Sequence, residues 1–345
     1  MSGPRILIVR TSAMGDIVHA LPVLDRLRQS LPDARIGWVV EQVFAPLLEG
    51  HPDLDAVIPV GLRSWRHRLF SPNAWREFGG FLRDLSDFSA DIVLDLMGSH
   101  KAGLIGACTL ADRRLGLTYG DRREPSSAMW LSETTSARGD HAVDHMLSVL
   151  EAGQLLRRGS GVAHFGGDKL PAQPWTRGPR EGDVFALLHP RTAWKNKNYP
   201  LESWSQVVRS VRDETGLETW VAWGPGEESA AREVAEASGS RVLEELATFP
   251  QLVALSRSAR IVLGGDTGPI HLAHALGTPV VCVMGPTDPE RNGPYQALAS
   301  SVSHRLPCSF CYQRLDETKA CLLNISPQRV VDKALEALSC AGESR

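Results

Sequence analysis

The chain lacks both a long apolar run and a strong excess of charge of either sign. No apolar run approaches the roughly 18 residues of a membrane-spanning helix, and the first residues lack the basic, apolar and small-residue order of a signal peptide. The formal net charge of -3 excludes a generally basic, nucleic-acid-binding surface, while 43% hydrophobic and 22% charged residues exclude a disordered chain. We therefore expect a folded cytoplasmic protein that binds no nucleic acid and meets any anionic partner at a local site.

Cysteine is also scarce, with six residues in 345, which is too few for a disulfide framework. Four of the six lie near the C-terminal end, at Cys308, Cys311, Cys321 and Cys340. The gaps of nine and eighteen residues that follow the first pair match no common zinc module. A zinc or iron site on these four cysteines is therefore the lesser expectation.

Short apolar runs alternate with helical periodicity in both halves of the chain, which is typical of parallel sheets built from βαβ units. Strands are predicted at residues 6–9, 36–40, 57–60 and 92–96, and again at 185–188, 220–223, 261–264 and 280–284. Residues 166–183, rich in Pro and Gly, separate the two series as a predicted linker. The sequence thus predicts two doubly wound, Rossmann-like α/β domains that face each other across a ligand-binding cleft.

The predicted domains span residues 1–165 and 184–325. A last helix within residues 326–345 is expected to pack on either domain, including back on the N-terminal one. Within the first domain, the stretch RTSAMGDIVHALP at residues 10–22 follows the first predicted strand directly. Its apolar spacing predicts a helix that begins at about Asp16.

Asp16 has two compatible interpretations. A carboxylate at a helix N-terminus is a common N-cap, and a carboxylate at the carboxyl end of a strand can also take a proton from a substrate hydroxyl. Gly15 permits close backbone approach, so the N–H groups around Ser12 and Gly15 are candidates for holding an oxyanion. The turn is neither a P-loop nor a dinucleotide fingerprint, because it lacks the Lys-Ser or Lys-Thr pair and the three glycines that these motifs need.

A second informative stretch is LGGDTGPIHLAHALGTP, residues 263–279. Pro269 suits the first turn of a helix, so the free N–H groups at that helix start and the Thr267 hydroxyl are predicted to receive a pyrophosphate. Asp266 is interpreted as a residue that caps and shapes the loop. His271 and His274 share a helix face, but the Glu of a His-Glu-x-x-His zinc motif is absent.

Two further loops follow predicted strands in the second half. Arg191, Lys195 and Lys197 place cations where one of them can neutralise a leaving diphosphate, although a solvated loop explains them equally well. Glu227 or Glu228, in WGPGEES, is placed either to bind ribose hydroxyls or to cap the next helix.

Basic residues gather in the first half of this mildly acidic chain. They comprise RSWRHR at residues 63–68, together with Lys101, Arg113, Arg114, Arg122 and Arg123. Such a cluster indicates either an anionic acceptor or a solvated face. The Asp53-x-Asp55 pair resembles a metal-binding signature, but its position in a Pro-containing turn favours turn chemistry.

These stretches together resemble glycosyltransferase family 9, the ADP-heptose:lipopolysaccharide heptosyltransferases, and are most similar to its heptosyltransferase I group. The resemblance covers nearly the whole chain. It rests on ILIVRTSAMGDIVHALP, GWVVEQVFAPL, RSWRHRLF, REP at residues 123–125, KNYP at 197–200, WGPGEE, GGDTGPIHLAHALGTP and MGPTDP at 284–289.

The resemblance implies a GT-B fold, no required metal or other cofactor, and an inverting transfer of heptose. The implied donor is ADP-L-glycero-D-manno-heptose, and the implied acceptor is a Kdo hydroxyl of the anionic lipopolysaccharide inner core. Asp16 matches the family's general base, and Lys197 matches its phosphate-neutralising lysine. The donor-binding candidates are Ser12, Gly15, Arg191, Glu227, Asp266, Thr267, Gly268 and His271, and the acceptor-binding candidates are Arg63, Arg66, Lys101 and Arg123.

The chain departs from the heptosyltransferase I group at Ser64, where that group has a second consecutive arginine before the tryptophan. The cysteine-bearing tail is closer to family branches that bind iron and glycosylate proteins. The alternatives are therefore a heptosyltransferase with a protein or other glycan acceptor, a sugar-nucleotide epimerase, and a non-catalytic nucleotide-sugar or metal-binding protein. An acceptor in the inner membrane also predicts peripheral contact with its cytoplasmic face through Trp65, Leu69, Phe70 and the nearby arginines.

Overall fold

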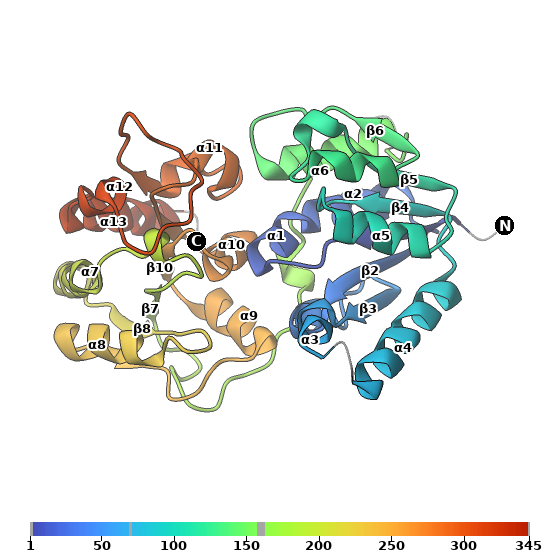
Figure 1. The fold of residues 1–345 in the computed structure, drawn as a ribbon. Helices are drawn as coiled ribbons and strands as arrows, with labels where there is room; N and C mark the ends of the chain where they lie inside the picture. The colour runs from blue at the N-terminus through green and yellow to red at the C-terminus, as the bar shows by residue number, and fades with distance from the viewer. Residues whose placement is uncertain (1–2, 69–70, 157–162, 344–345) are drawn as a thin grey trace. The chain divides into compact units, whose positions relative to one another are not determined.

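The computed structural model describes residues 3–68, 71–156 and 163–343. The chain forms two compact units, Met1–Pro171 and Ala172–Arg345, drawn in blue to green and in yellow to red in Figure 1. Their boundary falls inside the stretch 166–183 that the sequence marks as a linker. None of the described helices is long and apolar enough to span a membrane.

The first unit is built on a parallel sheet whose strand order is β3-β2-β1-β4-β5-β6. Its strands are β1 (Arg5–Val9), β2 (Arg35–Glu41), β3 (Ala56–Val60), β4 (Ile92–Asp95), β5 (Arg113–Leu117) and β6 (Glu133–Thr135). The strand order reverses between the neighbours β1 and β4, so the loops that follow these two strands lie at the switch point where doubly wound sheets bind ligands.

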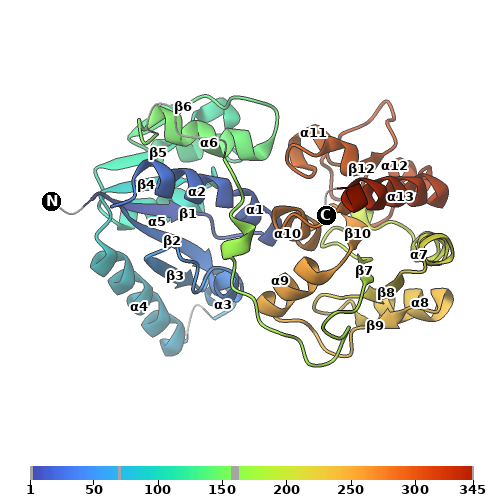
Figure 2. The same cartoon turned by 180° about the vertical axis from the view of Figure 1, so that it is seen from behind.

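Helices cover both faces of the first sheet. Leu85 and Phe88 of α4 and Ile105 of α5 pack against one face, on Val9 and Val93 of the strands. On the other face α2 packs on α6, which contacts β5, and Figure 2 shows both helices in front of the sheet. The helices of this unit are α1 (Met14–His19), α2 (Leu21–Ser30), α3 (Leu62–Arg66), α4 (Pro72–Phe88), α5 (His100–Cys108) and α6 (Ala142–Ala152), with 3₁₀ turns η1 (Gln42–Leu47), η2 (Tyr119–Asp121), η3 (Pro125–Trp130) and η4 (Gly167–Lys169).

The second unit repeats this plan with the order β12-β11-β10-β7-β8-β9. Its strands are β7 (Phe185–His189), β8 (Glu218–Val221), β9 (Arg241–Val242), β10 (Ile261–Gly265), β11 (Val280–Met284) and β12 (Ser301–Ser303). All the pairings are parallel, and β7 and β10 occupy the switch point. The loops after β7 and β10 carry the Lys197 and Asp266 motifs.

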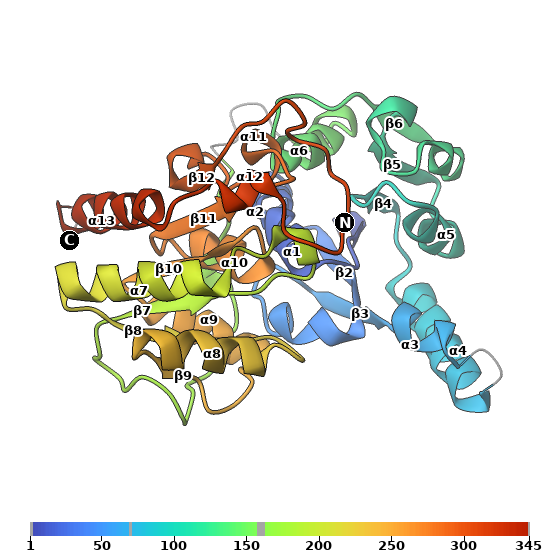
Figure 3. The same ribbon diagram turned by 60° about the vertical axis from the view of Figure 1, so that its left-hand side comes forward.

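One face of the second sheet is covered by α7, α8 and α13, which lie side by side in Figure 3, and the other face is covered by α9 and α10. The last helix, α13, packs on α7 and β11 of this unit, because its apolar stripe includes the buried Val330, Val331 and Ala334. The helices are α7 (Leu201–Thr215), α8 (Glu228–Ser238), α9 (Phe249–Ser258), α10 (Gly268–Ala275), α11 (Pro289–Asn292), α12 (Ala320–Leu323) and α13 (Pro327–Glu343), with η5 (Lys195–Lys197) and η6 (Leu298–Ser300).

Each predicted strand overlaps an observed one, and the predicted α/β fold class is confirmed. Apolar runs did not reveal β5, β6, β9 and β12. Three of these are edge strands of two or three residues with few apolar side chains, and β5 begins with the pair Arg113-Arg114. Such strands are specified by pairing with a neighbour rather than by their own sequence.

Candidate active site

Asp266 is the centre of a buried polar network at the carboxyl end of β10. Its Oδ2 accepts from Lys197 Nζ at 2.5 Å and from the Thr287 hydroxyl at 2.7 Å, while its Oδ1 lies 3.1 Å from His271 Nε2. The side chains of Lys197, His271 and Asp266 are only 12%, 5% and 9% exposed. The three loops after β7, β10 and β11 are therefore joined at this one carboxylate.

The ionised form of Asp266 is strongly favoured. Burial by itself raises the pKa of this carboxyl, but the hydrogen bond with His271 and the charge of Lys197 outweigh burial and hold the pKa well below its usual range. The interpretation of Asp266 as a helix cap was wrong, because Thr267 is the N-cap residue of α10 and Asp266 instead binds the three side chains around it. A carboxylate is tolerated near an anion site here because its charge is already balanced by Lys197.

The start of α10 has the geometry expected of an anion site. Thr267 adopts extended backbone at the N-cap, its hydroxyl makes no capping bond, and Pro269 lies in the first turn as predicted. The Thr267 hydroxyl and the Gly268 N–H are thus placed at the positive end of the helix. Gly265 permits the neighbouring loop to approach, because a Cβ there would lie 2.8 Å from Thr192 Cγ2.

The loop after β7 is held by its own side chains. Asn198 Oδ1 accepts from the Thr192 N–H at 2.7 Å, and the Thr192 hydroxyl donates to the Trp194 carbonyl at 2.9 Å. Lys197 Nζ lies 4.4 Å from the centroid of the Trp194 ring. Arg191, in the same loop, is half-buried and takes part in none of the ion pairs found among the described residues. Lys197, rather than Arg191 or Lys195, is therefore the cation fixed at the helix start.

Glu227 and Glu228 differ in their contacts. Glu227 Oε2 accepts from the Gly224 N–H at 2.9 Å, which closes the turn after β8. Glu228 forms an ion pair of 2.6 Å with Arg232, one turn further along α8. Glu227 stands at the N-cap position of α8 but makes no side-chain capping bond, so of the two acids it is the one held in the loop at the strand end.

Asp16 in the first unit is the third residue of α1 rather than its N-cap, which is Ala13. Its Oδ2 accepts from the Ala13 N–H at 3.1 Å, and its Oδ1 forms an ion pair of 2.8 Å with Arg10. The carboxylate remains 42% exposed. The interpretation of Asp16 as the N-cap was therefore wrong, but its bond from the Ala13 N–H is compatible with a proton-accepting role, because each carboxylate oxygen keeps capacity for a further hydrogen bond.

Arg10 is a site residue that the sequence analysis did not identify. Its guanidinium binds the Leu96 carbonyl after β4 as well as Asp16, and its side chain is 14% exposed. It opens the quoted stretch RTSAMGD, and the signal available in the sequence was an arginine directly after an apolar run. Ser12 and Gly15, both half-buried, lie in the same turn.

Seven basic residues of the predicted cluster in the first unit fall into two groups. Arg63, Arg66, Lys101 and Arg123 are exposed, on α3, on the first turn of α5 and in the loop after β5. The other three serve the fold. Arg113 pairs with Glu133 at 2.6 Å, Arg114 donates to the Trp130 carbonyl at 2.8 Å, and Arg122 pairs with Asp95. The inclusion of Arg122 in an acceptor surface was therefore wrong, because its side chain is buried on Asp95, whereas Arg113 and Arg114 are half-buried and bonded within the unit.

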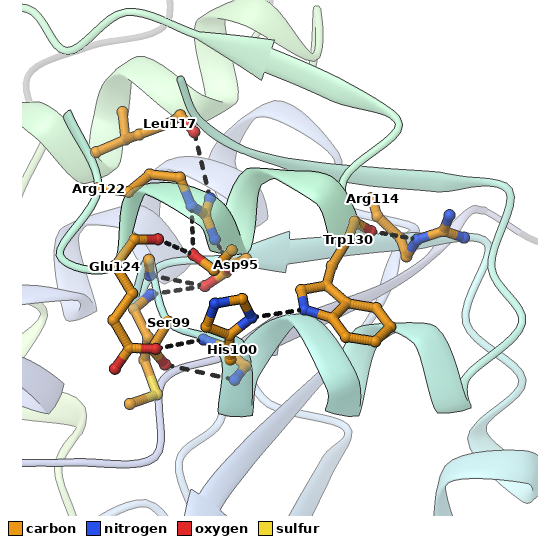
Figure 4. A network of polar contacts seen from close by, with 12 residues as sticks. Asp95, Ser99, His100, Arg114, Leu117, Arg122, Glu124 and Trp130 are labelled. Atoms are coloured by element: carbon orange, nitrogen blue, oxygen red, sulfur yellow. Dashed lines mark hydrogen bonds and ion pairs between the residues drawn. The ribbon is translucent and has the colours of Figure 1, made fainter. Parts of the chain in front are cut away.

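Figure 4 shows the network around Arg122 and Asp95, whose side chains are 0% and 2% exposed. Arg122 also donates to Ser127 Oγ at 2.9 Å and to the Leu117 carbonyl at 3.2 Å. Asp95 Oδ1 accepts from the N–H groups of Met97 and Gly98 at 2.9 and 3.0 Å. The pair thereby joins the loop before α5 to the loop that carries Arg123.

His100 and Glu124 add a second connection in the same network. Glu124 accepts from the His100 N–H at 2.8 Å, while the His100 ring contacts Trp130 Nε1 at 3.1 Å and Ser126 Oγ at 2.8 Å. Lys101 and Arg123 are thus carried on elements that are tied together below the surface.

Metal ligation receives no support from the described residues. No three His, Cys, Asp or Glu side chains in that part of the chain are grouped to hold a metal ion, and Cys308, Cys311, Cys321 and Cys340 are not joined in disulfides. The Asp53-x-Asp55 carboxylates are occupied by Lys169 at 2.6 Å and Arg28 at 2.8 Å, which are ion pairs with distant residues rather than bonds within the turn. The predicted membrane contact involves Leu69 and Phe70, which lie outside the described residues.

Comparison with known proteins agrees with the motifs. The sequence pattern of glycosyltransferase family 9 (heptosyltransferase) matches residues 79–322. Lipopolysaccharide heptosyltransferase 1 of Pseudomonas aeruginosa is 29% identical over 99% of both chains, and that of Escherichia coli K12 is 30% identical over 84% of this chain and 91% of the relative. A solved structure, Escherichia coli heptosyltransferase WaaC with ADP, superposes with a TM-score of 0.79 at 26% identity, over 96% of this chain and 99% of that one.

Two doubly wound units, each on a six-stranded parallel sheet, and the likeness to a solved heptosyltransferase define a glycosyltransferase of the GT-B class. More narrowly, the chain belongs to glycosyltransferase family 9, the heptosyltransferase family. The resemblance drawn from the sequence motifs is thereby confirmed.

Proposed function

We propose that the protein transfers heptose from ADP-L-glycero-D-manno-heptose to a Kdo hydroxyl of the lipopolysaccharide inner core, with inversion and without a metal ion. The observation that carries the proposal is the exposed Asp16 carboxylate, held by Arg10 and the Ala13 N–H at the carboxyl end of β1. The relatives named lipopolysaccharide heptosyltransferase 1 and the ADP-bound neighbour support this donor and acceptor class.

In the proposed reaction Asp16 accepts the proton of the acceptor hydroxyl while the oxygen attacks the anomeric carbon and the bond to ADP breaks. The leaving diphosphate gains negative charge, which Lys197, the Thr267 hydroxyl and the Gly268 N–H stabilise. Asp266 keeps Lys197 in position, and its own charge is shared among three donors. These protein cations and dipoles replace the charge that a divalent metal would supply.

The remaining roles follow from position. Glu227 is proposed to bind the ribose hydroxyls, and Arg63, Arg66, Lys101 and Arg123 are proposed to bind the anionic acceptor because they are exposed on one unit. An inner-core acceptor belongs to a membrane lipid, so we propose that the enzyme works in the cytoplasm and binds peripherally to the inner membrane.

The test is ADP release and product mass in a reaction of ADP-heptose with a delipidated Kdo-containing acceptor in EDTA. We expect the wild type to add one heptose, and Asp16→Asn to lower kcat by several orders of magnitude while ADP affinity is retained. Asp84→Asn, which changes an exposed carboxylate on α4, is the matched control and should behave as wild type.

Each other outcome separates one part of the proposal. Transfer that needs added metal would contradict metal independence, and an Asp16→Asn variant with most of its kcat would contradict the assignment of the base. ADP-heptose binding without transfer to Kdo would favour a protein or other glycan acceptor. An isomerised donor without ADP release would indicate an epimerase.

A further inference from the structure

Residues 304–319, which connect β12 to α12, form a strap along the loop that carries Lys197. The Asn196 side-chain amide donates to the Gln313 carbonyl at 2.8 Å, and the Thr318 hydroxyl donates to the Asn198 carbonyl at 2.9 Å. These two bonds attach the strap to the loop on either side of residue 314.

Trp194 is the point where the strap and the loop place their cations together. Arg314 Cζ lies 4.3 Å from the centroid of the Trp194 ring, and Lys197 Nζ lies 4.4 Å from the same centroid. A tryptophan ring attracts cations through its quadrupole, which stabilises both side chains in this position against their mutual repulsion. Two cations therefore occupy one small region beside Asp266 and the start of α10.

The two cations differ in how much of their charge is already balanced. Lys197 is paired with Asp266, whereas Arg314 is exposed and forms none of the ion pairs found in the described part of the chain. The acidic neighbours of Arg314 in the strap have other partners, since Asp316 pairs with Lys195 and Glu317 pairs with Lys319. The charge of Arg314 is thus available to a ligand.

We propose that Arg314 is a second cationic ligand of the donor diphosphate and that Trp194 is a positioning residue that aligns Arg314 with Lys197. The inference rests on the proposed function in that it takes a nucleoside diphosphate sugar as the donor. A diphosphate carries more negative charge than a lysine already paired with a carboxylate can balance. A guanidinium supplies the remaining charge and can bind two phosphate oxygens at once.

The experiment measures dissociation constants by calorimetry for ADP, adenosine and inorganic pyrophosphate on the full-length protein. We expect Arg314→Ala to weaken ADP and pyrophosphate about tenfold, the size of one charge-assisted contact, and to leave adenosine unchanged. Arg314→Lys should recover part of the loss. Arg305→Ala is the matched control, because Arg305 lies on the same strap but stacks on Phe310 at 5.5 Å and faces Glu290 at 3.7 Å.

The positioning role of Trp194 is tested by comparing the ADP affinities of single and double variants, because a purely structural role would not make the effect of Arg314→Ala depend on Trp194. Trp194→Leu should weaken ADP binding as Arg314→Ala does, Trp194→Phe should restore most of it, and Trp194→Leu combined with Arg314→Ala should be no weaker than Trp194→Leu alone. Simple addition of the two effects would overturn the positioning role.

If Arg314→Ala binds ADP as tightly as the wild type, the inference is overturned and the proposed function still stands. If Arg305→Ala loses as much ADP affinity as Arg314→Ala, the inference is also overturned, because the loss then reflects the overall charge of the strap. If the wild type binds pyrophosphate but not ADP, the proposed function is contradicted. The pyrophosphate affinities of wild type and Arg314→Ala would then still test the role of Arg314. A wild type that binds neither would contradict both.

Discussion

Arg10 and Asp16 form an ion pair of 2.8 Å across the turn that joins β1 to α1, and Arg10 is fixed at its other side by the Leu96 carbonyl. The carboxylate proposed to be the base is therefore oriented by a residue that is itself held between two strand ends. Such a support is what a catalytic carboxylate on a short helix needs, because a small displacement of the base lowers the rate strongly.

Arg10→Ala should lower kcat of heptose transfer by about 10- to 100-fold, because the carboxylate loses the partner that orients it. ADP affinity should change little, since Lys197, Thr267 and Gly268, which are proposed to hold the diphosphate, belong to the second unit. Initial rates with both substrates saturating, paired with ADP titrations, check this. Arg10→Lys should fall between wild type and Arg10→Ala, and an unchanged kcat in Arg10→Ala would contradict the role.

Asp266→Asn should lower the free energy of unfolding at pH 7 by about 3 kcal/mol, because it leaves Lys197 buried without its carboxylate. The lowered pKa of Asp266 sets the sign of the pH dependence. The stabilisation is fully present above the ordinary carboxyl pKa of 3.8 and is lost as the pH falls below it. Urea unfolding between pH 7 and pH 3 should therefore show the wild type approaching the variant as the pH falls.

The control for Asp266→Asn is Asp316→Asn, which breaks the exposed ion pair with Lys195, where Asp316 is 92% exposed. Exposed pairs contribute about 0 to 1 kcal/mol, so this variant should remain close to wild type. A parallel pH dependence of wild type and Asp266→Asn would show that another group is responsible.

Arg122→Met should lower the free energy of unfolding by about 3–5 kcal/mol, because it leaves the Asp95 carboxylate buried without its partner. Replacement of both residues by apolar ones, Arg122→Met with Asp95→Leu, should restore part of the loss. Chemical denaturation of the wild type, the two single variants Arg122→Met and Asp95→Leu, and the double variant gives the coupling energy between the two residues. Arg138→Met is the comparison, because its pair with Glu151 has side chains 77% and 47% exposed.

His189, at the end of β7, should make the protein less stable in mild acid. Burial lowers the pKa of His189 from 6.5 to about 4, so between these pH values the unfolded chain binds a proton that the folded chain does not. Lowering the pH from 6.5 to 5 should therefore cost about 2 kcal/mol of stability through this residue. Urea midpoints across that range should fall more steeply for wild type than for His189→Gln, whereas His67→Gln, at an exposed site, should follow wild type.

Local sequence determined the strands with apolar runs, the helix with Pro269 in its first turn and the loops that carry Asp16, Lys197 and Asp266. These features are readable because neighbouring residues decide them. A buried strand needs a continuous apolar run, and a helix start needs a suitable residue at one or two positions. The motif loops follow as the segments between them.

The tertiary structure decided which of these loops share a carboxylate and which arginines are internal. Lys197 and Asp266 are 69 residues apart, Asp95 and Arg122 are 27 apart, and Asn196 and Gln313 are 117 apart. No periodicity relates residues at such separations. They meet because parallel strands bring their carboxyl ends to one edge of each sheet, where a fully buried charge is stable only beside a partner.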